Sequence, residues 1–344
     1  MYHTIVIGAG QAGLAMGYYL TQSNNNFLIL DKGNDIGQVW RSRYDSLTLF
    51  TSRMYSSLPG LTLVGDAQGL PTKEEIALYL ETYAAKFKLP IQLETEVLKV
   101  AHKEDVFSVE TNKGILTARN IIIATGPFHH KYIPHFAEKL SCDVIQLHSS
   151  EYKNPSQLKP GNALVVGGGN SGAQIAVELS GTKNTYLSVS QKLRFLPLKM
   201  GAKSIFWWFD KLGILKATNT STIGKKIQQN GDPIFGYELK KAIKESEVTL
   251  KEKVINIEKN DVIFKDNTKL RVDNIIWATG FKQKYSWLDI DNIYNKKEMI
   301  KHQRGLTAIR GLYFLGLPWQ YKRGSSLLQG VGEDAKYIMN HMNS

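Results

Sequence analysis

The stretch that decides the fold is TIVIGAGQAGLAMGYYL, residues 4–20. Its first four residues form a short apolar run that is typical of a buried strand. Gly8, Gly10 and Gly13 follow in G-x-G-x-x-G spacing, and apolar residues then recur at helical spacing. A strand, a glycine turn and a helix in this order predict the first half of a dinucleotide-binding βαβ unit.

The three glycines have separate tasks in such a unit. Gly8 allows the tight turn, Gly10 lets a pyrophosphate approach the backbone, and Gly13 lets the helix pack on the strand. The helix N-terminus offers free N–H groups and a partial positive charge to the phosphates. A second apolar run, residues 27–30, ends in Asp31, at about the spacing where a carboxylate binds ribose hydroxyls.

The same arrangement occurs again as LVVGGGNSGAQIAVEL, residues 164–179. Gly167, Gly169 and Gly172 repeat the spacing of the first loop. The elements predicted around them are a strand at 163–166, a helix at 171–180 and a strand at 185–189.

The second unit ends differently from the first, because Gln191 and Lys192 follow its last strand and no acid does. An acid would repel a ribose 2′-phosphate, whereas Gln191 and Lys192, with Arg194 nearby, can accept one. The alternative for Lys192 is a solvated surface side chain. One unit has an acidic residue after its last strand and the other has none, which predicts that the two sites bind different nucleotides. We expect FAD in the first site and NADPH in the second, with NADH also open because Gln191 is neutral.

Composition narrows the class of protein. A chain of 344 residues with 42% hydrophobic content and a mean hydropathy of −0.25 is typical of a globular protein. No apolar run reaches the roughly 18 residues that span a bilayer, and no signal peptide precedes the first strand, so we expect a cytoplasmic protein without an integral membrane segment. The single cysteine, Cys142, excludes a redox dithiol and is expected to be a small buried apolar residue.

The net charge of +12 is compatible with nucleic-acid binding. The lysines are spread along the chain, however, so we expect a solvated basic surface that also attracts anionic dinucleotides, and no nucleic-acid partner. We find no metal-ligand spacing and no convincing Ser-His-Asp or Cys-His motif. The oligomeric state is open, with a homodimer as one candidate.

Two further motifs support a pair of nucleotide units. NIIIATGP (120–127) and NIIWATGF (274–281) are near-repeats in which a buried strand ends in Ala-Thr-Gly. A late strand in GLYFLGLPW (311–319) and a helix beginning at about Gly332 are expected to pack back on the first unit. The predicted fold is therefore α/β with two Rossmann-like domains. The NAD(P)H-binding domain, 156–280, is inserted into the FAD-binding domain, 1–155 and 281–344.

The aromatic, basic stretch 203–244 is harder to interpret. Ile205, Trp208, Leu212 and Leu215 fit one helical face. This pattern favours a helix packed over a nucleotide domain or a lid on the substrate cleft, with a membrane-surface helix as the less favoured alternative. A further helix is predicted at 73–88.

Taken together, these motifs resemble those of the small bacterial flavin-containing monooxygenases, which are flavoproteins with two dinucleotide-binding domains. The resemblance extends almost from end to end. Besides both glycine loops and both Ala-Thr-Gly turns, it rests on Gly37–Trp40, on SSLPG at 56–60, on GDPIFGYEL at 231–239 and on GLPWQYKRGSSLLQGVGEDA at 316–335.

The identifying pattern of that family, F-x-G-x-x-x-H-S-x-x-Y, corresponds to CDVIQLHSSEY, residues 142–152. His148, Ser149 and Tyr152 match, whereas Cys142 and Val144 depart from it. The segment lacks the Trp-Pro ending of classical Baeyer–Villiger enzymes, which weakens the case for ketone oxidation. We expect His148 to be a linker hydrogen-bonder rather than a catalyst.

The resemblance implies an FAD-dependent, NAD(P)H-driven monooxygenase that forms a C4a-hydroperoxyflavin and oxygenates a small soft nucleophile, a sulfide or amine or else a ketone. The partners would be this small molecule and oxygen. No catalytic side chain is expected, because the flavin carries the chemistry. Some relatives place an Asn beside the flavin. LTLFTSR, residues 47–53, has none, so Phe50 and Thr51 are the expected lining residues.

Three alternatives stay open. They are an NAD(P)H oxidase that produces hydrogen peroxide, a flavin reductase that serves a ferredoxin-type partner, and a redox sensor that binds nucleotides without turnover.

The helix at Gly332 is expected to direct its positive N-terminus at the flavin. The predicted FAD-binding residues are Gly8, Gly10, Gln11, Ala12, Gly13, Asp31, Lys32, Gln38, Val39, Trp40, Arg41, Val97, Ala124, Thr125, Gly126, Gly316 and Gly332. The predicted NADP-binding residues are Gly167, Gly169, Asn170, Ser171, Gly172, Gln191, Lys192, Ala278, Thr279 and Gly280.

Overall fold

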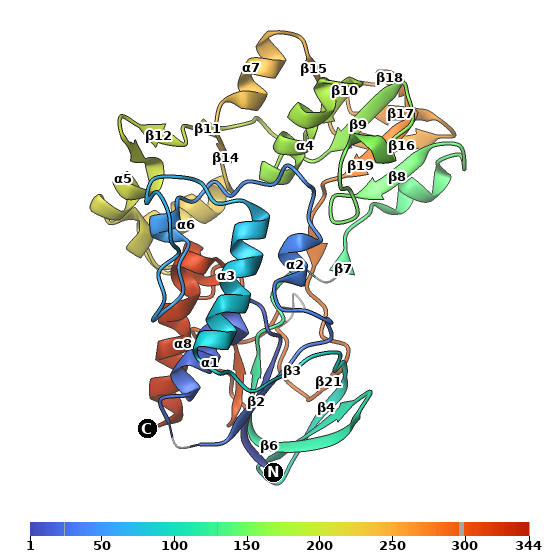
Figure 1. The fold of residues 1–344 in the computed structure, drawn as a ribbon. Coiled ribbons are helices and arrows are strands. Elements are labelled where there is room, and N and C mark those ends of the chain that lie inside the picture. Colours follow the sequence, from blue (N-terminus) through green and yellow to red (C-terminus); the bar gives the residue numbers. More distant parts are fainter. Residues whose placement is uncertain (24, 129, 296–298, 344) are drawn as a thin grey trace.

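The chain forms two lobes, each built on its own sheet (Figure 1). The computed structural model describes residues 1–23, 25–128, 130–295 and 299–343. The first lobe contains an eight-stranded sheet and both chain ends, and the second contains a five-stranded sheet. This architecture confirms the predicted α/β class with two Rossmann-like units.

The first sheet is organised around its longest strand, β6. β6 pairs in parallel with β1 on one edge. On the other edge it pairs with antiparallel β5 along its first half and with parallel β22 along its second half. The strands of this sheet are β1 (Tyr2–Ile7), β2 (Phe27–Leu30), β3 (Ile91–Gln92), β4 (Val97–Lys103), β5 (Val106–Thr111), β6 (Gly114–Ile123), β21 (Leu288–Asp289) and β22 (Leu312–Phe314).

Three helices cover the parallel half of this sheet: α1 (Gln11–Leu20), α3 (Lys73–Lys86) and α8 (Leu328–Met342). α3 starts with a capping box between Thr72 and Glu75, which explains why the helix predicted at 73–88 is found here. The other short helices of this lobe are α2 (Gln38–Arg41), η1 (Arg53–Tyr55) and η5 (Arg323–Ser326).

The predicted start of the last helix at Gly332 is wrong, because α8 begins at Leu328. Its N-cap, Leu327, makes no side-chain capping bond, so the sequence carries no start signal at that point. Gly332 lies inside the helix, where it faces Pro59. A Cβ at this position would overlap the proline ring.

The five strands of the second lobe are all parallel. In spatial order they are β15 (Val248–Lys251), β10 (Asn184–Ser188), β9 (Asn162–Val166), β19 (Asn274–Trp277) and β8 (Ile145–His148). Around this sheet lie α4 (Asn170–Ser180), α7 (Glu238–Lys244), η2 (His135–Lys139), η3 (Pro155–Gln157) and an antiparallel sheet of β16 (Val254–Glu258), β17 (Asp261–Phe264) and β18 (Lys269–Arg271).

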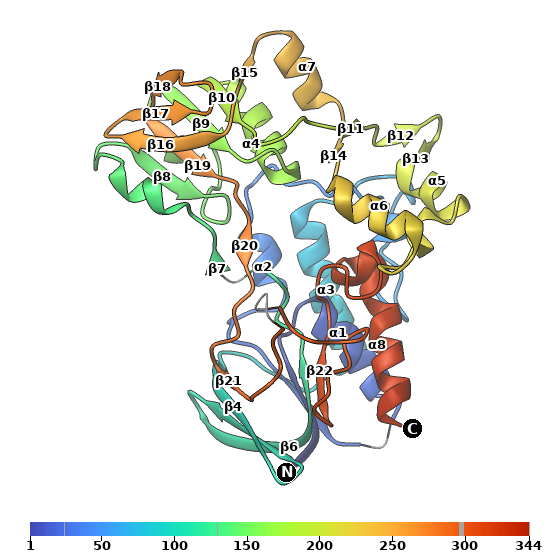
Figure 2. The same ribbon diagram turned by 180° about the vertical axis from the view of Figure 1, so that it is seen from behind.

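The pairing of β8 departs from the predicted division at residue 155/156. That division leaves residues 145–148 in the first domain, whereas β8 pairs with β19 in the second sheet. The chain crosses between the lobes through β7 (His130–Lys131) and β20 (Phe281–Lys282), which pair antiparallel (Figure 2). The chain therefore enters the second sheet at β8, soon after β7, and leaves it after β19. The division into an FAD-binding and an NAD(P)H-binding domain stays a prediction.

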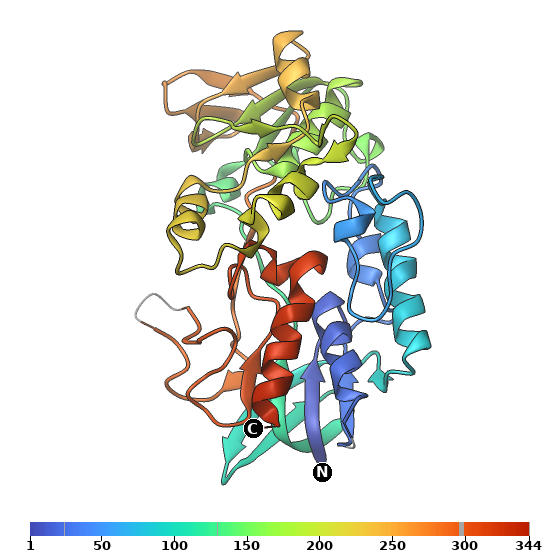
Figure 3. The ribbon, with the colours of Figure 1, turned by 90° about the vertical axis from the view of Figure 1, so that its left-hand side faces the viewer.

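A third part, residues 192–235, lies over the first lobe beside α8 (Figures 2 and 3). We call it the bridging segment. Its elements are β11 (Phe195–Leu196), β12 (Lys199–Met200), β13 (Lys203–Ser204), α5 (Ile205–Lys211), η4 (Ile214–Lys216), α6 (Thr222–Asn230) and β14 (Ile234–Phe235). α5 ends at Lys211, and Leu212 is 69% exposed, so the single apolar face predicted for this stretch is not formed.

Gly332→Ala is expected to lower the free energy of unfolding by about 1–2 kcal/mol, because overpacking against Pro59 outweighs the better helix propensity of alanine. Lys336→Ala, at an exposed position of α8, is the matched control. Chemical denaturation measures both. A Gly332→Ala protein as stable as the wild type would contradict the packing of α8 on Pro59.

Candidate active site

The first glycine loop lies at the carboxyl end of β1. Gly8 has a φ of +109°, and its N–H donates to the Leu30 carbonyl at 2.7 Å. A Cβ at Gly13 would overlap the Gly8 carbonyl oxygen, so α1 can approach the loop this closely only with glycine there. A Cβ at Gly10, in contrast, would meet no atom within 4 Å. Gly10 therefore borders open space at the N-terminus of α1.

The second glycine loop repeats this geometry after β9. Gly167 has a φ of +125°, and its N–H donates to the Ser188 carbonyl at 3.0 Å. A Cβ at Gly172 would overlap the Gly167 carbonyl oxygen, whereas one at Gly169 would meet nothing within 4 Å.

An Ala-Thr-Gly turn closes each loop. The Ala124 N–H donates to the Ile7 carbonyl at 2.8 Å, and the Ala278 N–H donates to the Val166 carbonyl at 2.9 Å. The last glycine of each turn, Gly126 or Gly280, also borders open space, with no atom within 4 Å of a Cβ built there. Each glycine loop and its turn thus form a cradle with open sides.

Both cradles fit the pyrophosphate of a dinucleotide. The helices that start there, α1 and α4, have no side-chain capping bond at Gly10 and Gly169. Their first-turn N–H groups and the positive ends of their dipoles therefore face the open space without a capping side chain. This is the environment that helix N-termini provide for phosphate groups.

Asp31 is held rigidly beside the first cradle. One carboxylate oxygen accepts the Ala9 N–H at 2.6 Å, and the other accepts the Gly33 N–H at 2.7 Å. The remaining lone pairs can accept ribose hydroxyls. The Thr95 N–H donates to the Asp31 carbonyl at 2.8 Å, which brings the strand that starts at Val97 to this end of the cradle.

The flavin-lining residues predicted on α2 differ in their surroundings. Gln38 and Val39 are exposed, as is the nearby Lys32, whereas Trp40 packs partly buried against the first-lobe core. The Arg41 guanidinium pairs with three carboxylates, those of Asp35, Glu74 and Glu81. Arg41 therefore ties α2 to α3, and its contact with a flavin stays a prediction.

The C-terminal part of the chain reaches the first cradle through α1. The Gln11 amide donates to the Ser326 carbonyl at 3.2 Å. A Cβ at Gly316 would lie 3.0 Å from the Ala12 Cβ. α8 thus begins beside α1, and its first turn is Leu328–Val331. That this end of the helix faces the flavin stays a prediction.

The residues predicted to bind NADP also differ in their exposure and hydrogen bonding. Ser171, Gln191 and Lys192 are exposed, and the Ser171 side chain is hydrogen-bonded to the Tyr44 hydroxyl. The Asn170 side chain is engaged, since its amide donates to the Pro233 carbonyl at 3.0 Å and accepts the Phe235 N–H at 2.9 Å. It holds β14 in place. Thr279 is hydrogen-bonded to the Tyr132 carbonyl.

His148 is fully buried next to the Ala-Thr-Gly turn of the second lobe. Its Nε2 donates to the Gly280 carbonyl at 2.9 Å, and its Nδ1 accepts the Ser150 N–H at 3.2 Å. The neutral imidazole ring can make both hydrogen bonds. Burial lowers the pKa of His148 below its ordinary value. The contacts are those of the hydrogen-bonder that the sequence predicts.

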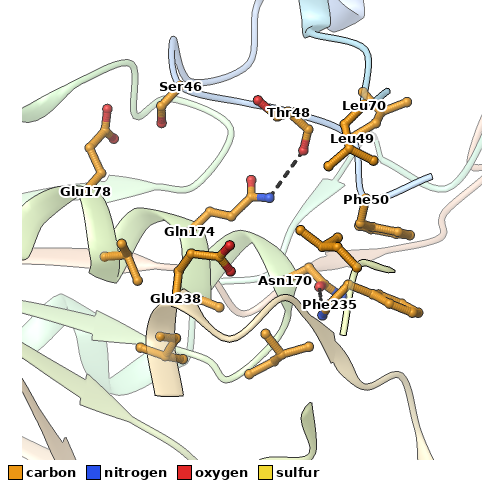
Figure 4. A pocket seen from close by; sticks show the side chains of 15 residues that line it. Ser46, Thr48, Leu49, Phe50, Leu70, Asn170, Gln174, Glu178, Phe235 and Glu238 are labelled. Carbon is orange, nitrogen blue, oxygen red and sulfur yellow. Dashed lines mark hydrogen bonds between the residues drawn. The ribbon is translucent and has the colours of Figure 1, made fainter. Parts of the chain in front are cut away.

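A cavity of about 490 Å³ lies between the lobes, against one face of α4 (Figure 4). Its walls are mostly apolar, and it contains two carboxylates, those of Glu178 and Glu238. Its fifteen described lining residues include no Lys, Arg or His. They are Ser46, Thr48, Leu49, Phe50, Leu70, Asn170, Ala173, Gln174, Val177, Glu178, Leu198, Ile234, Phe235, Glu238 and Leu239.

Gln174 connects the lobes at this cavity. Its amide donates to the Thr48 carbonyl at 3.2 Å, and its carbonyl accepts the Tyr44 hydroxyl at 2.5 Å. Burial raises the pKa of Tyr44 to about 12, so this hydroxyl keeps its proton at neutral pH. Sequence reasoning gave Gln174 no role, although it lies one helical turn after Asn170 on the same face of α4.

Phe50 and Thr51 have different surroundings. The Phe50 ring lies in the cavity wall and stacks on Phe235, with a centroid distance of 4.7 Å. Thr51 is buried, and its hydroxyl is 3.0 Å from the Ser56 hydroxyl. Phe50 thus places the predicted lining segment at the junction of the lobes.

Comparisons with known proteins agree with this geometry. Residues 5–193 match the family model of pyridine nucleotide-disulphide oxidoreductases, and residues 199–306 match that of flavin-binding monooxygenase-like proteins. The whole chain is 57% identical to 99% of an uncharacterized oxidoreductase, CzcO, from Bacillus subtilis. The chain belongs to the flavin-containing monooxygenase-like family.

More distant relatives are also similar to this chain. A flavin-containing monooxygenase from Stenotrophomonas maltophilia is 26% identical, with a TM-score of 0.84 over 99% of this chain and 98% of that one. The probable indole-3-pyruvate monooxygenase YUCCA3 of Arabidopsis thaliana is 28% identical over 94% of this chain and 84% of its own. The protein is thus a flavin-dependent oxidoreductase, and the predicted cofactors, FAD and NADPH, are confirmed.

The name of the first family model refers to disulphide chemistry, which needs a pair of redox-active thiols. This chain cannot form such a pair within itself. The chain has one cysteine, Cys142, and the expectation that it is buried is wrong. It is exposed because it lies in the turn between η2 and β8.

Gly10→Ala and Gly13→Ala form a pair that separates flavin binding from folding. Alanine at position 10 has room in the empty protein, so this variant is expected to fold but to retain at most about a tenth of the flavin. Alanine at position 13 clashes with the Gly8 carbonyl and should unfold at lower temperature even as apoprotein. Thermal unfolding and bound flavin after gel filtration measure the two effects. Full flavin retention by Gly10→Ala would contradict the assignment of this cradle.

His148→Gln is expected to cost about 1–2 kcal/mol at pH 8, because buried hydrogen bonds are lost. The folded-state pKa of His148 is lowered. On acidification through about 6.5, the unfolded chain therefore takes up a proton that the folded chain does not, and the wild type loses this advantage. Denaturation of both proteins between pH 8 and pH 5 measures the difference, with the exposed His135→Gln as control. A difference that does not depend on pH would contradict a neutral, buried ring.

Proposed function

We propose that the protein is an FAD-dependent, NADPH-driven monooxygenase that transfers one oxygen atom from O2 to a small amine or sulfide. The observation that carries this proposal is the junction of the lobes, where Phe50 and α4 line a mostly apolar, partly open cavity beside the second cradle. Bound FAD would supply hydride acceptance and oxygen activation. The side chains of this chain would supply binding, position and exclusion of water.

Each cradle has a defined task in this proposal. Gly10 and the first turn of α1 would bind the FAD pyrophosphate, and Asp31 would bind its ribose. At the second cradle, the exposed Gln191 and Lys192 would bind the ribose 2′-phosphate of NADPH. NADH would bind more weakly, because it offers these two side chains no phosphate.

The charges in the cavity favour an amine over a sulfide. In a chain with a net charge of +12, the cavity contains two glutamates, and its described lining residues include no cationic side chain. Glu178 accepts the Tyr152 hydroxyl at 2.7 Å, which fixes its position. The Glu238 carboxylate points toward the Gln174 side chain (Figure 4), where it can pair with an ammonium group. Phe50 and Phe235 offer aromatic surface for an apolar substituent.

A second candidate function is that of an NADPH oxidase that releases hydrogen peroxide. The observation that favours it is the nature of the predicted lining pair. Phe50 is apolar, and the Thr51 hydroxyl is already engaged with Ser56. Neither residue therefore offers a free hydrogen-bond donor of the kind that an Asn would provide.

The balance of products distinguishes the two functions. With benzyldimethylamine or methyl phenyl sulfide present, a monooxygenase forms about one N-oxide or sulfoxide per NADPH consumed, whereas an oxidase forms about one peroxide. Peroxide that accounts for all NADPH with every substrate tested would overturn the proposal. NADPH consumption that accelerates only when ferredoxin is added would indicate a flavin reductase. If neither NADPH nor NADH reduced the flavin, only the redox sensor without turnover would fit.

Glu238→Gln is expected to raise KM for the amine about two- to fivefold and to leave KM for the sulfide unchanged, because an exposed ion pair contributes up to about 1 kcal/mol. Glu245→Gln is the matched control, since Glu245 follows the same helix and lies outside the cavity. Steady-state kinetics with both substrates measure the effect. An equal change for both substrates would argue against a cationic ligand at Glu238.

A further inference from the structure

The bridging segment, residues 192–235, has an unusual charge. It contains eight of the Lys and Arg residues of the chain and only two acids, Asp210 and Asp232. Its net charge of +6 is half of the +12 of the whole protein, although it is about an eighth of the length. The lysines are therefore more concentrated here than a uniform basic surface would require.

Both acids of this segment bind groups of the first lobe. The Asp210 carboxylate accepts the Tyr55 hydroxyl at 3.2 Å, and the Asp232 carboxylate pairs with the Arg323 guanidinium at 2.8 Å. Further bonds fix the segment on this side, including that from the Asn219 N–H to the Tyr321 carbonyl at 2.7 Å. The outward side of the segment is thus left with basic side chains.

Apolar side chains are exposed among these lysines. The Trp208 indole N–H donates to the Met200 carbonyl at 3.2 Å, and its ring is 4.9 Å from that of Trp207. The ammonium groups of Lys203 and Lys211 lie 5.9 and 5.6 Å from the centre of the Trp207 ring. We call these five residues together with Leu212 the tryptophan corner. Leu212 is 69% exposed, Met200 49% and Trp208 37%.

The tryptophan corner lies at the outer edge of the molecule. α5 projects away from the strands of both sheets in opposite views (Figures 1 and 2). Ile223 on α6, flanked by the exposed Lys225 and Lys226, adds a second exposed apolar side chain to the segment, 56% exposed.

We propose that the tryptophan corner binds the surface of an anionic lipid bilayer, with Trp208, Leu212 and Met200 at the headgroup boundary and the lysines on the phosphates. Tryptophan and lysine with exposed aliphatic neighbours are the side chains that such an interface favours. No helix among the described residues could span a bilayer, so the contact is peripheral.

Other occupants fit less well. A second copy of the chain would bring two segments of charge +6 together, and like charges repel. A nucleic acid would satisfy the lysines and could stack on the tryptophan, but it would leave Leu212 and Met200 without apolar contacts. Only a lipid surface matches both the charge and the aliphatic side chains.

Co-sedimentation with vesicles tests this proposal on the full-length holoenzyme. We expect binding to vesicles of phosphatidylcholine with one third phosphatidylglycerol, weaker binding at high salt, and little binding to phosphatidylcholine alone. Lys203→Gln with Lys211→Gln should weaken binding roughly 30-fold, at about 1 kcal/mol per lysine near such a surface. Trp208→Ser with Leu212→Ser should weaken it at least as much. Brominated lipids should quench the tryptophan fluorescence of the wild type more strongly than that of the Trp208→Ser variant.

Matched controls use other exposed residues, Lys103→Gln with Lys336→Gln for the charges and Leu78→Ser with Ile115→Ser for the apolar side chains. They should bind like the wild type, and the bound flavin of every variant reports that it is folded. Equal weakening by the control lysines would mean unspecific charge attraction and would overturn the proposal. So would no binding to anionic vesicles, or binding of single-stranded RNA that competes fully with the vesicles.

Discussion

In both lobes a helix packs directly on the glycine turn that precedes it. This contact sets the geometry of both nucleotide cradles. In each lobe, the third glycine of the motif lies so close to the carbonyl oxygen of the first that any side chain would overlap it. This contact fixes where α1 and α4 begin. Their uncapped first turns therefore lie at the carboxyl ends of the parallel strands, next to an Ala-Thr-Gly turn whose alanine N–H donates to the end of the strand before the loop.

The junction of the lobes follows from this placement. Because α4 must start at its glycine loop, one of its faces lies against the first-lobe segment that contains Tyr44 and Thr48. Gln174 on this face is hydrogen-bonded to both residues. The bridging segment closes the same junction from the other side. Phe235 stacks on Phe50, and Arg323 lies 5.3 Å from the centre of the Phe235 ring. The cavity is thus lined by parts of the chain that are distant in sequence.

The features that could be predicted from the sequence are those with short-range signals. The glycine loops, Asp31 and α3 each carry a local motif, spacing or cap. The start of α8 could not be predicted, because Leu327 is not a capping residue. The place of β8 depends on a strand far along the chain, and the surroundings of Phe50 depend on the bridging segment, whose pattern suggested only one helix. The exposure of Cys142 depends on its place in a turn, which the residue type does not indicate.

The insertion of the second lobe has a consequence for biosynthesis. All five strands of its sheet lie before residue 278, whereas the first lobe still needs β22 and α8. A ribosome therefore releases a complete second lobe while the β6 edge that receives β22 and the α1 face that receives α8 are still uncovered. The nascent chain must keep this half-built sheet from pairing wrongly until β22 and α8 emerge.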